Sequence, residues 1–278
     1  MNKEYIEGYL AEYAKKLLIQ VEEEVSSTNT LLKQEAVKGV PEGTVLIACR
    51  QTTGKGRLGR SFYSPEETGI YMSLLLRPEL KAQDSLLITT AAAVATAEAI
   101  ETVTGVKTGI KWVNDIYCHD RKAVGILTEG GLQAGTDQLA YAVLGIGINL
   151  WEPTGGFPEE IAKIAGSVLT ESFQPDTIEK EKLRCRLAAE VLNQFMRIYP
   201  QLTEKKFMNA YRKRSFLIGQ EVSLIRADHR ADMDLPMVRV INVGDDAQLI
   251  VELPDGTRQE VSSGEVSVRM AEWRKEWH

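Results

Sequence analysis

The chain has 278 residues, 44% of them hydrophobic and 26% charged, which is an ordinary globular composition with enough length for a sizeable core. Its formal net charge of −6 argues against a general affinity for nucleic acid, because phosphate binding needs clustered Lys and Arg. The three cysteines and three histidines are scattered, which argues against a disulfide framework or a metal site. We therefore predict a cytoplasmic protein with reduced, buried or half-buried cysteines.

Neither a signal peptide nor a membrane span is expected. Residues 1–20 carry Glu4, Glu7 and Glu12 and lack the apolar core of a signal peptide. The most apolar stretch, residues 86–100, is too short to cross a bilayer and contains Glu98. We expect this stretch to form a buried helix.

Periodicity and turn residues predict a mixed set of helices and strands over the first 215 residues. A short amphipathic helix is expected at 2–18, and Ser27 or Thr28 is placed to cap a second helix. The expected strands are 44–49, 70–76, 109–112, 116–117, 123–129 and 139–150. Further helices are expected at 82–104, 178–199 and 203–214, and a turn at Gly130, Gly131 and Gly135.

After Phe216 the chain changes character, because short strands follow one another closely. They are expected at 222–226, 238–243, 249–253, 258–261 and 266–268. Turn residues separate them, as in Gly244-Asp245-Asp246, and this spacing is typical of a small β-barrel. We therefore predict two domains, 1–215 and 216–278, with the boundary near residue 215.

A glycine-rich loop at 51–60, Gln-Thr-Thr-Gly-Lys-Gly-Arg-Leu-Gly-Arg, follows one expected strand and precedes another. Its GxGxxG spacing is that of a dinucleotide-binding fold, but no helix opens at the last glycine, so we reject that interpretation. A phosphate-binding loop of the GxxxxGK[ST] type is also excluded. Three cations, Lys55, Arg57 and Arg60, on a flexible backbone favour an anion site over a solvated basic turn.

This loop resembles the Gly-Arg-Gly-Arg-x-Gly-Arg signature of biotin–protein ligases. Five further segments resemble that family's motifs in the same order: Ser-Thr-Asn at 27–29, Lys-Trp-Val-Asn-Asp at 111–115, Lys-Ala-Val-Gly-Ile-Leu-Thr-Glu at 122–129, Gly-Ile-Gly-Ile-Asn at 145–149 and Ser-Gly-Glu-Val-Ser-Val-Arg at 263–269. The resemblance covers about residues 24–270. The sequence departs from the family pattern at Lys55, Phe62 and Val113, where Arg, Trp and Pro are common.

The resemblance implies an α/β (α+β) fold, with a mixed-sheet catalytic domain related to class II aminoacyl-tRNA synthetases and a C-terminal SH3-like β-barrel. It implies a ligase that forms biotinyl-5′-AMP from biotin and ATP with Mg²⁺, then transfers biotin to a lysine of a biotin carboxyl carrier protein domain of a carboxylase. The segment before Glu24 is too short for the family's DNA-binding domain, so we expect no repressor function. We expect no nucleic-acid or membrane partner, and a homodimer is left open.

The resemblance also assigns roles to individual residues. Lys122 would contact the carboxyl end of biotin and the α-phosphate, where fixed cations stabilise the growing charge, and Arg57 would order the loop over the intermediate. The residues implied in biotin binding are Ser27, Thr28, Asn29, Gln51, Lys55, Gly56, Arg57, Lys122 and Gly125. Those implied in binding ATP or the adenylate are Arg57, Arg60, Trp112, Asn114, Asp115, Lys122, Asn149 and Arg269.

Simpler interpretations stand beside these roles. Ser27 or Thr28 caps a helix whether or not it also binds the ureido ring. Trp112 either stacks near adenine or packs in the core, and Asn114-Asp115 is also an ordinary turn sequence. Trp273 and Trp277 lie four residues apart, as on one helical face packed against the body.

Two other functions compete with a biotin ligase. A lipoate–protein ligase would use the same chemistry on another acid, but the 51–60 loop and the Gly-Glu-Val-Ser segment favour biotin. A non-catalytic biotin sensor or regulator is disfavoured by the retained Lys122 and by the short N-terminal segment.

Overall fold

The computed structural model describes residues 1–66, 68–170, 176–226, 237–262 and 266–270. Its larger sheet has seven strands in the order β1-β2-β3-β7-β6-β5-β4. The pair β1 and β2 is parallel, and the other neighbours are antiparallel. The strands are β1 Leu18–Val25, β2 Thr44–Gln51, β3 Gly69–Leu76, β4 Gly109–Lys111, β5 Asp115–Cys118, β6 Arg121–Leu132 and β7 Leu139–Asn149.

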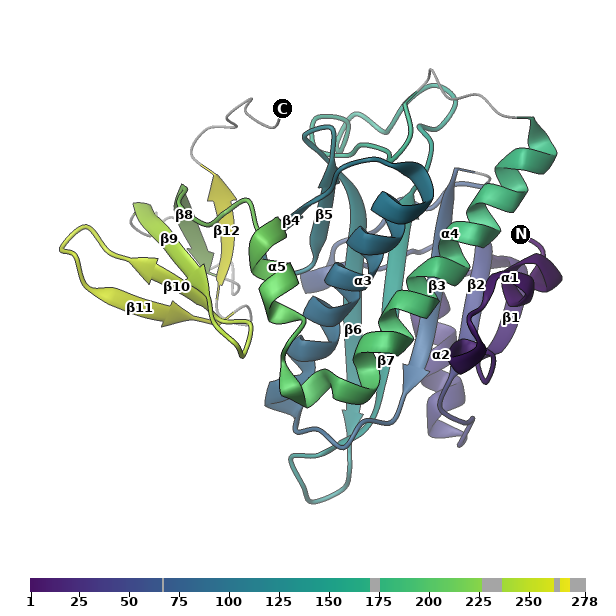
Figure 1. The fold of residues 1–278 in the computed structure, drawn as a ribbon, viewed down its shortest axis with the longest axis horizontal. Helices are drawn as coiled ribbons and strands as arrows, with labels where there is room; N and C mark the ends of the chain where they lie inside the picture. The colour runs from purple at the N-terminus through teal and green to yellow at the C-terminus, as the bar shows by residue number, and fades with distance from the viewer. Residues whose placement is uncertain (67, 171–175, 227–236, 263–265, 271–278) are drawn as a thin grey trace.

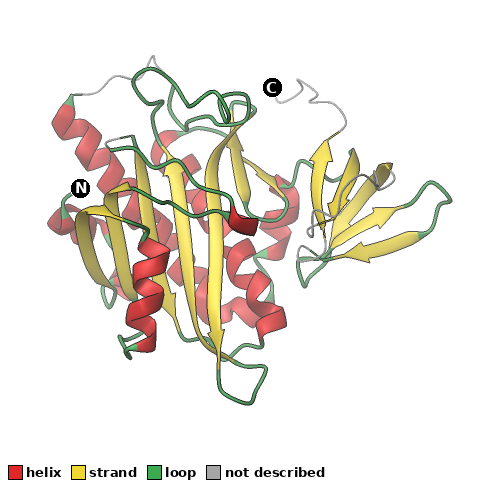
Figure 2. Ribbon diagram, turned by 180° about the vertical axis from the view of Figure 1, so that it is seen from behind, coloured by secondary structure: helices red, strands yellow, loops and turns green. Residues whose placement is uncertain are grey.

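Helices cover both faces of this sheet, which makes the fold mixed α/β. Helices α3 Leu86–Thr104 and α4 Thr177–Ile198 lie together on one face, and α2 Thr28–Val37 lies on the other (Figures 1 and 2). Leu32 of α2 packs with Leu46, Leu75 and Val143 of the sheet. The remaining elements are α1 Lys3–Tyr9, α5 Met208–Arg214 and the 3₁₀ turns η1 Glu12–Ala14, η2 Arg57–Gly59, η3 Ala82–Ser85 and η4 Tyr199–Glu204.

Helix α3 is the core helix predicted from its apolar sequence. With η3 it forms the stretch Ala82–Thr104, which is long and apolar enough to cross a membrane among the described residues, but 72% of its most apolar window is buried in the protein. It ends at Gly105, whose φ of 73° is the left-handed conformation that favours glycine at a helix end. The prediction of a buried helix at 86–100 is therefore confirmed.

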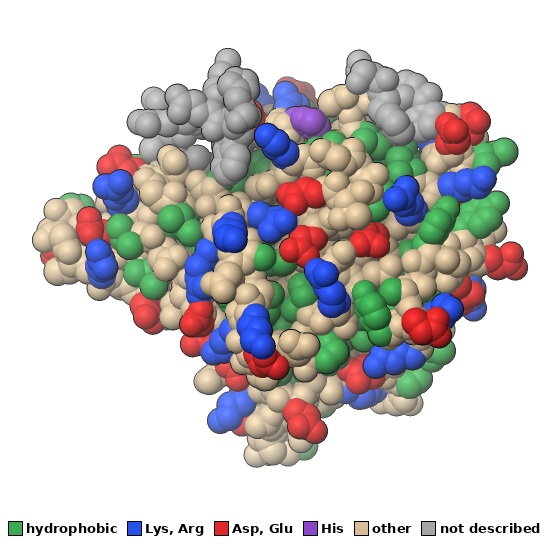
Figure 3. Space-filling view, viewed as in Figure 1, with side chains coloured by type: hydrophobic (Ala, Val, Ile, Leu, Met, Phe, Trp, Pro, Cys, Tyr) green, Lys and Arg blue, Asp and Glu red, His purple; other side chains and the backbone are tan. Residues whose placement is uncertain are grey.

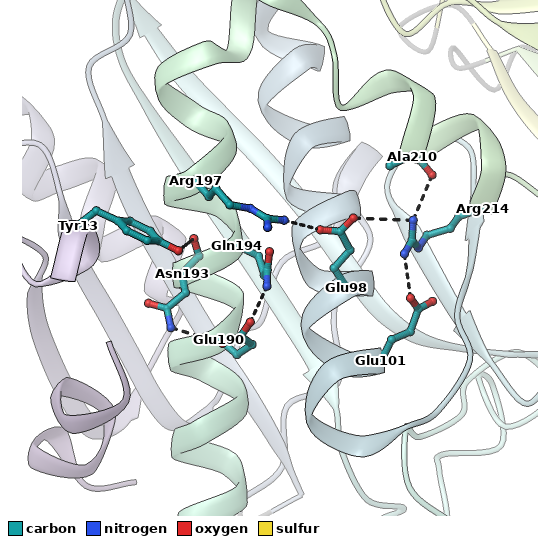
Figure 4. A network of polar contacts seen from close by, with 9 residues as sticks. All are labelled: Tyr13, Glu98, Glu101, Glu190, Asn193, Gln194, Arg197, Ala210 and Arg214. Carbon is teal, nitrogen blue, oxygen red and sulfur yellow. Dashed lines mark hydrogen bonds and ion pairs between the residues drawn. The ribbon is translucent and has the colours of Figure 1, made fainter. Parts of the chain in front are cut away.

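Ion pairs join α3 to the two helices beside it. Glu98 of α3 lies 2.9 Å from Nη2 of Arg197 on α4, and Glu101 lies 2.8 Å from Nη2 of Arg214 on α5 (Figure 4). Acidic and basic side chains are intermixed over this helical face of the molecule (Figure 3). These ion pairs add to the apolar packing that holds the three helices together.

The C-terminal part forms a second sheet of five antiparallel strands in the order β11-β10-β9-β8-β12. The strands are β8 Glu221–Arg226, β9 Met237–Val243, β10 Leu249–Glu252, β11 Arg258–Val261 and β12 Val266–Met270. This sheet stands beside α5 (Figure 1), and Nε of Arg212 donates to the carbonyl of Val243 at 2.7 Å. The expected run of short strands after Phe216 is confirmed.

Two expected elements differ from the structure. The helix expected at 2–18 ends at Tyr9, and from Leu18 the chain forms the edge strand β1, whose acidic residues face solvent. The turn expected at Gly130 and Gly131 is instead strand, because both residues pair with β7. Glycine at 131 leaves room for the ring of Tyr141, which lies 2.6 Å from where a Cβ would stand. The turn follows only after Leu132.

The cysteines are free and buried, as predicted for Cys49, Cys118 and Cys185. Burial raises the pKa of the Cys118 thiol to about 12, so this side chain behaves as a small apolar group at neutral pH. The prediction for Trp273 and Trp277 concerns residues outside those that the structure describes.

Candidate active site

A pocket that is partly open to solvent lies where α2 begins against the sheet. One wall is polar and comes from the start of α2 and the end of β2. The other wall comes from the 51–62 loop and the strands β3, β6 and β7. The lining residues are Ser27, Thr28, Asn29, Gln51, Lys55, Phe62, Tyr71, Met72, Gly125, Leu127, Gly145, Ile146 and Gly147.

The polar wall begins with the N-cap of α2. Ser27 accepts a hydrogen bond from the Thr30 amide at 3.5 Å, so the capping interpretation holds, and Ser27 lines the pocket as well. The amide and hydroxyl of Thr28 both donate to Oε1 of Gln51, at 2.9 and 3.1 Å. Nε2 of Gln51 donates to the buried Ser64 hydroxyl at 2.9 Å. The Gln51 amide is thus fixed, with one N–H of Nε2 left for a ligand.

Asn29 is buried, and its neighbours fix the orientation of its amide. Nδ2 donates to Oε2 of Glu129 at 3.0 Å, and Oδ1 accepts from the Ser73 hydroxyl at 2.6 Å. Glu129 is also paired with Lys33 at 2.6 Å. A Cβ at Gly145 would stand 2.2 Å from Oδ1 of Asn29, so glycine makes room for this amide.

The apolar wall is dominated by Phe62, which follows the glycine-rich loop. Its ring lies 2.6 Å from where a Cβ of Gly147 would stand and 3.0 Å from that of Gly125. The two glycines therefore leave space for an aromatic ring directly on the strands β6 and β7. The same ring makes an edge contact with Tyr71, at 6.4 Å between centroids.

The glycine-rich loop folds into a tight turn. The Gly56 amide donates to the Arg60 carbonyl at 2.7 Å, and Leu58 at φ 55° is left-handed within the 3₁₀ turn η2. The chain then continues as extended backbone, so the rejection of a dinucleotide-binding fold is confirmed. Lys55 and Arg60 are exposed, and Lys55 lines the pocket.

Arg57 ties this loop to the β4–β5 connection. Its Nη1 donates to Oδ1 of Asn114 at 3.1 Å, and Asn114 is held in turn by Nδ2 donating to the Ile126 carbonyl at 2.9 Å. Burial lowers the pKa of the Arg57 guanidinium, although nearby Asp115 raises it, and the net shift is downward. An arginine remains charged at neutral pH, so the half-buried guanidinium is a fixed cation next to the pocket.

Lys122 supplies a second cation at the start of β6. Its Nζ lies 2.7 Å from Oδ1 of Asp115, and the two side chains are only 29% and 22% exposed. Its Cε lies 3.6 Å from where a Cβ of Gly125 would stand, and Gly125 lines the pocket. Lys122 and Arg57 therefore place two positive charges close to a pocket with one polar wall.

Six predicted residues line the pocket: Ser27, Thr28, Asn29, Gln51, Lys55 and Gly125. The predicted residues Gly56, Arg57, Arg60, Asn114, Asp115 and Lys122 lie outside this lining, and so do three others. Trp112 is 6% exposed and donates from Nε1 to the carbonyl of Ala247 at 2.7 Å, a geometry that favours core packing over stacking on adenine. Asn149 is buried at the end of β7 and donates to the Gly166 carbonyl at 3.1 Å. Arg269 lies on β12, but its side chain falls outside the described structure.

The structure adds residues that the sequence motifs did not identify. Ser64 holds Gln51, Ser73 contacts Thr28 and Asn29, and Lys33 holds Glu129. Ser73 could have been found from the sequence, since apart from Tyr71 it is the one hydroxyl side chain inside the apolar stretch 70–76. Ser64 and Lys33 carried none, because their partners are distant in sequence.

The pocket and its motifs have counterparts in known proteins. Residues 21–149 match the model of the Biotin/lipoate A/B protein ligase family. The biotin–[acetyl-CoA-carboxylase] ligase of Mycobacterium tuberculosis is 30% identical over 213 residues, which are 73% of this chain and 73% of that protein. The chain belongs to the biotin–protein ligase family.

Other members of the biotin–protein ligase family agree with this assignment. The bifunctional ligase/repressor BirA of Bacillus spizizenii is 43% identical over 144 residues, 52% of this chain. The match spans only 44% of that relative's length. The biotin protein ligase of Aquifex aeolicus in complex with biotin and ATP superposes with a TM-score of 0.70 at 28% identity, covering 91% of this chain and 99% of that one.

Proposed function

We propose that this chain activates biotin with ATP and transfers it to a lysine of a carrier protein. The observation that carries the proposal is a polar pocket wall with two held cations close by. Thr28, Asn29 and Gln51 supply fixed donors and acceptors in the pocket lining, and Arg57 and Lys122 are held just outside that lining by Asn114 and Asp115. Biotin offers a matching pair of groups, a ureido ring at one end and a carboxylate at the other.

The polar wall suits a buried urea, because unmatched polar groups there would be costly. Asn29 and Gln51 are held by other side chains, so their remaining hydrogen-bonding capacity is fixed in direction. We assign the ureido ring to Ser27, Thr28, Asn29 and Gln51. The thioether ring and the chain then lie along Gly125, beneath Lys55, Gly56 and the Phe62 ring.

In the first step the biotin carboxylate oxygen attacks the α-phosphorus of ATP and pyrophosphate leaves. Lys122 and Arg57 would stabilise the negative charge that grows on the α-phosphate. In the second step the Nζ of a carrier lysine attacks the acyl carbon, and AMP leaves. For the nucleotide we assign Arg57, Arg60, Asn114, Asp115, Lys122, Asn149 and Arg269, and we leave Trp112 a supporting role from the core.

Magnesium fits this site only as an ion carried by the nucleotide. Among the described residues no group of three or more His, Cys, Asp or Glu side chains is placed to hold a metal ion. Mg²⁺ is commonly bound by one or two side-chain oxygens together with substrate phosphates, and Asn114 and Asp115 offer such oxygens beside Lys122. The ion would supply further charge neutralisation at the phosphates.

The remaining assignments extend the same proposal. We infer a catalytic domain at 1–215, related to class II aminoacyl-tRNA synthetase cores, and an SH3-like barrel at 216–278 built on the five-stranded sheet. The partner would be a biotin carboxyl carrier protein domain of a carboxylase, met in the cytoplasm. The named activity of the M. tuberculosis relative supports this choice of partner.

Transfer to a carrier tests the complete proposal. Purified protein is incubated with biotin, ATP, Mg²⁺ and a carrier domain, and the carrier's intact mass is measured. The proposal predicts one added biotinyl group, and none on a carrier whose acceptor lysine is changed to arginine. Equal labelling of that arginine variant, or no labelling of either carrier, would contradict it.

A further inference from the structure

The end of the β4–β5 connection and the first residue of β5 hold the cations of the site. Asn114 accepts from Arg57 at 3.1 Å, and Asp115 pairs with Lys122 at 2.7 Å. On the β6 side this connection is fixed twice, because the Ile126 amide donates to the Asn114 carbonyl at 3.0 Å and Asn114 donates back to the Ile126 carbonyl. The contacts on the opposite side of this connection come from elements outside the large sheet.

Tyr211 of α5 contacts that other side. Its side chain is fully buried, and its hydroxyl donates to the carbonyl of Val113 at 3.1 Å, immediately before Asn114. Burial raises the pKa of Tyr211, with Asp115 raising it further and Arg57 opposing, so the hydroxyl stays a neutral donor at any ordinary pH and lies close to both charged side chains.

A second contact reaches the same segment from the small sheet. Nε1 of Trp112 donates to the carbonyl of Ala247 at 2.7 Å, in the connection between β9 and β10. Arg212, one residue after Tyr211, holds that connection by donating to the Val243 carbonyl and pairing with Asp245. Helix α5 therefore supports residues 112–113 both directly and through the small sheet.

Resting on the proposed function, we propose that Tyr211 is a positioning residue for adenylate formation. By holding the Val113 carbonyl, it fixes the turn that presents Asn114 to Arg57 and Asp115 to Lys122. It touches no substrate. A purely packing role for the ring would leave the hydroxyl dispensable, whereas the positioning role makes the hydroxyl itself matter.

The variant Tyr211→Phe removes that one oxygen and keeps the ring. We expect the single-turnover rate of biotin-dependent pyrophosphate release to fall about tenfold, as the loss of one buried hydrogen bond allows. Biotin affinity should stay within about twofold, because Ser27, Asn29 and Gln51 are held by other contacts. The matched control is Tyr199→Phe, which removes a hydroxyl bonded to Glu42 at 2.7 Å, away from the pocket.

Hydrogen exchange gives a readout that does not need turnover. The Ile126 amide, bonded to the Asn114 carbonyl, should exchange about tenfold faster in Tyr211→Phe than in the wild type or in Tyr199→Phe. If the wild type releases no pyrophosphate with biotin, the proposed function fails, and the exchange rates alone then decide whether Tyr211 holds the turn.

A wild-type rate and wild-type exchange in Tyr211→Phe would overturn the inference. So would an equal fall in rate and biotin affinity, which would indicate general destabilisation. If Tyr211→Phe does not fold, Arg212→Leu replaces it, since that side chain is 24% exposed and holds the Ala247 connection. A lower rate at constant biotin affinity is then expected, and an unchanged rate would overturn the proposal.

Discussion

Nζ of Lys122 lies 2.7 Å from Oδ1 of Asp115, so the cation proposed to meet the α-phosphate is already held by a carboxylate before any substrate arrives. The two residues stand on adjacent strands, β6 and β5. The pair fixes the position of the lysine charge, and in a partly buried place this avoids an unpaired charge. When ATP binds, the lysine can be shared between Asp115 and the phosphate.

Replacing Lys122 by alanine should slow adenylate formation by roughly 10²–10³, as the loss of one electrostatic donor to a transition state typically does. The measurement is single-turnover pyrophosphate release at saturating biotin and ATP. Lys81→Ala is the matched control, because it removes an ion pair of 3.0 Å with Asp137 far from the pocket. Equal rates for wild type and Lys122→Ala would refute the assignment.

Replacing Arg57 by glycine should let the biotinyl-adenylate escape from the enzyme. The variant loses the bond to Asn114 that ties the glycine-rich loop to the core, while Lys55 and Lys122 remain. The adenylate would still form but escape, because a closed loop is what keeps water and bystander nucleophiles from it. The measurement is biotinylation of an unrelated protein at equal adenylate production.

Arg50→Ala is the control for this experiment, since Arg50 pairs with Glu24 on the exposed edge of the sheet. Hydrogen exchange adds a second readout: biotin with ATP should protect the amides of residues 54–60 in the wild type and less so in Arg57→Gly. If the variant biotinylates the unrelated protein no more than the wild type does, Arg57 does not retain the intermediate.

Glu129 should make the pocket sensitive to acid. Burial raises the pKa of this carboxyl, but hydrogen bonds from Lys33 and Asn29 outweigh it, and the net pKa lies below the ordinary value. Its stabilisation is therefore fully present above the unfolded pKa of about 4.3 and is lost as pH falls through the lower folded value. Biotin affinity and the free energy of unfolding should fall together in that window.

The variant Glu129→Gln should flatten this acid dependence and weaken biotin binding at neutral pH, because the Lys33 charge loses its partner. Glu35→Gln, which affects an exposed pair with Lys38, is the matched control. An identical pH profile for wild type and Glu129→Gln would show that this carboxyl does not hold Asn29 in its binding orientation.

Adding a methyl group at Gly145 should block the ureido end of the pocket. Its Cβ would stand 2.2 Å from Oδ1 of Asn29, so either the amide or the strand must move. We expect biotin affinity to fall at least about tenfold, as the loss of one bonded polar contact in a buried site does. Gly8→Ala has open space around its Cβ and serves as the control; calorimetry with biotin alone decides the outcome.

The sequence predicted the strands of the pocket well, because β2, β3 and β7 are apolar runs bounded by clear turn residues. It predicted no strand at β1, an acidic edge strand that begins at Leu18, where the helix expected at 2–18 was to end. It also failed at Gly130 and Gly131, which were expected in a turn but lie in a strand beside the Tyr141 ring of the neighbouring strand. Both failures arise from neighbours that periodicity does not reveal.

For the site, local motifs identified the residues that line the pocket, such as Ser27, Asn29 and Gln51. They did not identify Ser73 or Tyr211, which act on those motifs from other elements. Trp112 was left undecided from the sequence, and only its bond to Ala247 shows why it is buried. Local sequence patterns do not predict the supporting contacts between segments that are distant in sequence.

Pyrophosphate release from ATP with a single carboxylic acid present tests the central claim most directly. The protein, without any carrier, is given ATP, Mg²⁺ and either biotin or lipoate. The polar wall of the pocket and the two cations near it predict release with biotin that exceeds the release with lipoate and the release with no acid. Release with lipoate alone would make the chain a lipoate ligase, and no release with either acid would contradict the proposed adenylation.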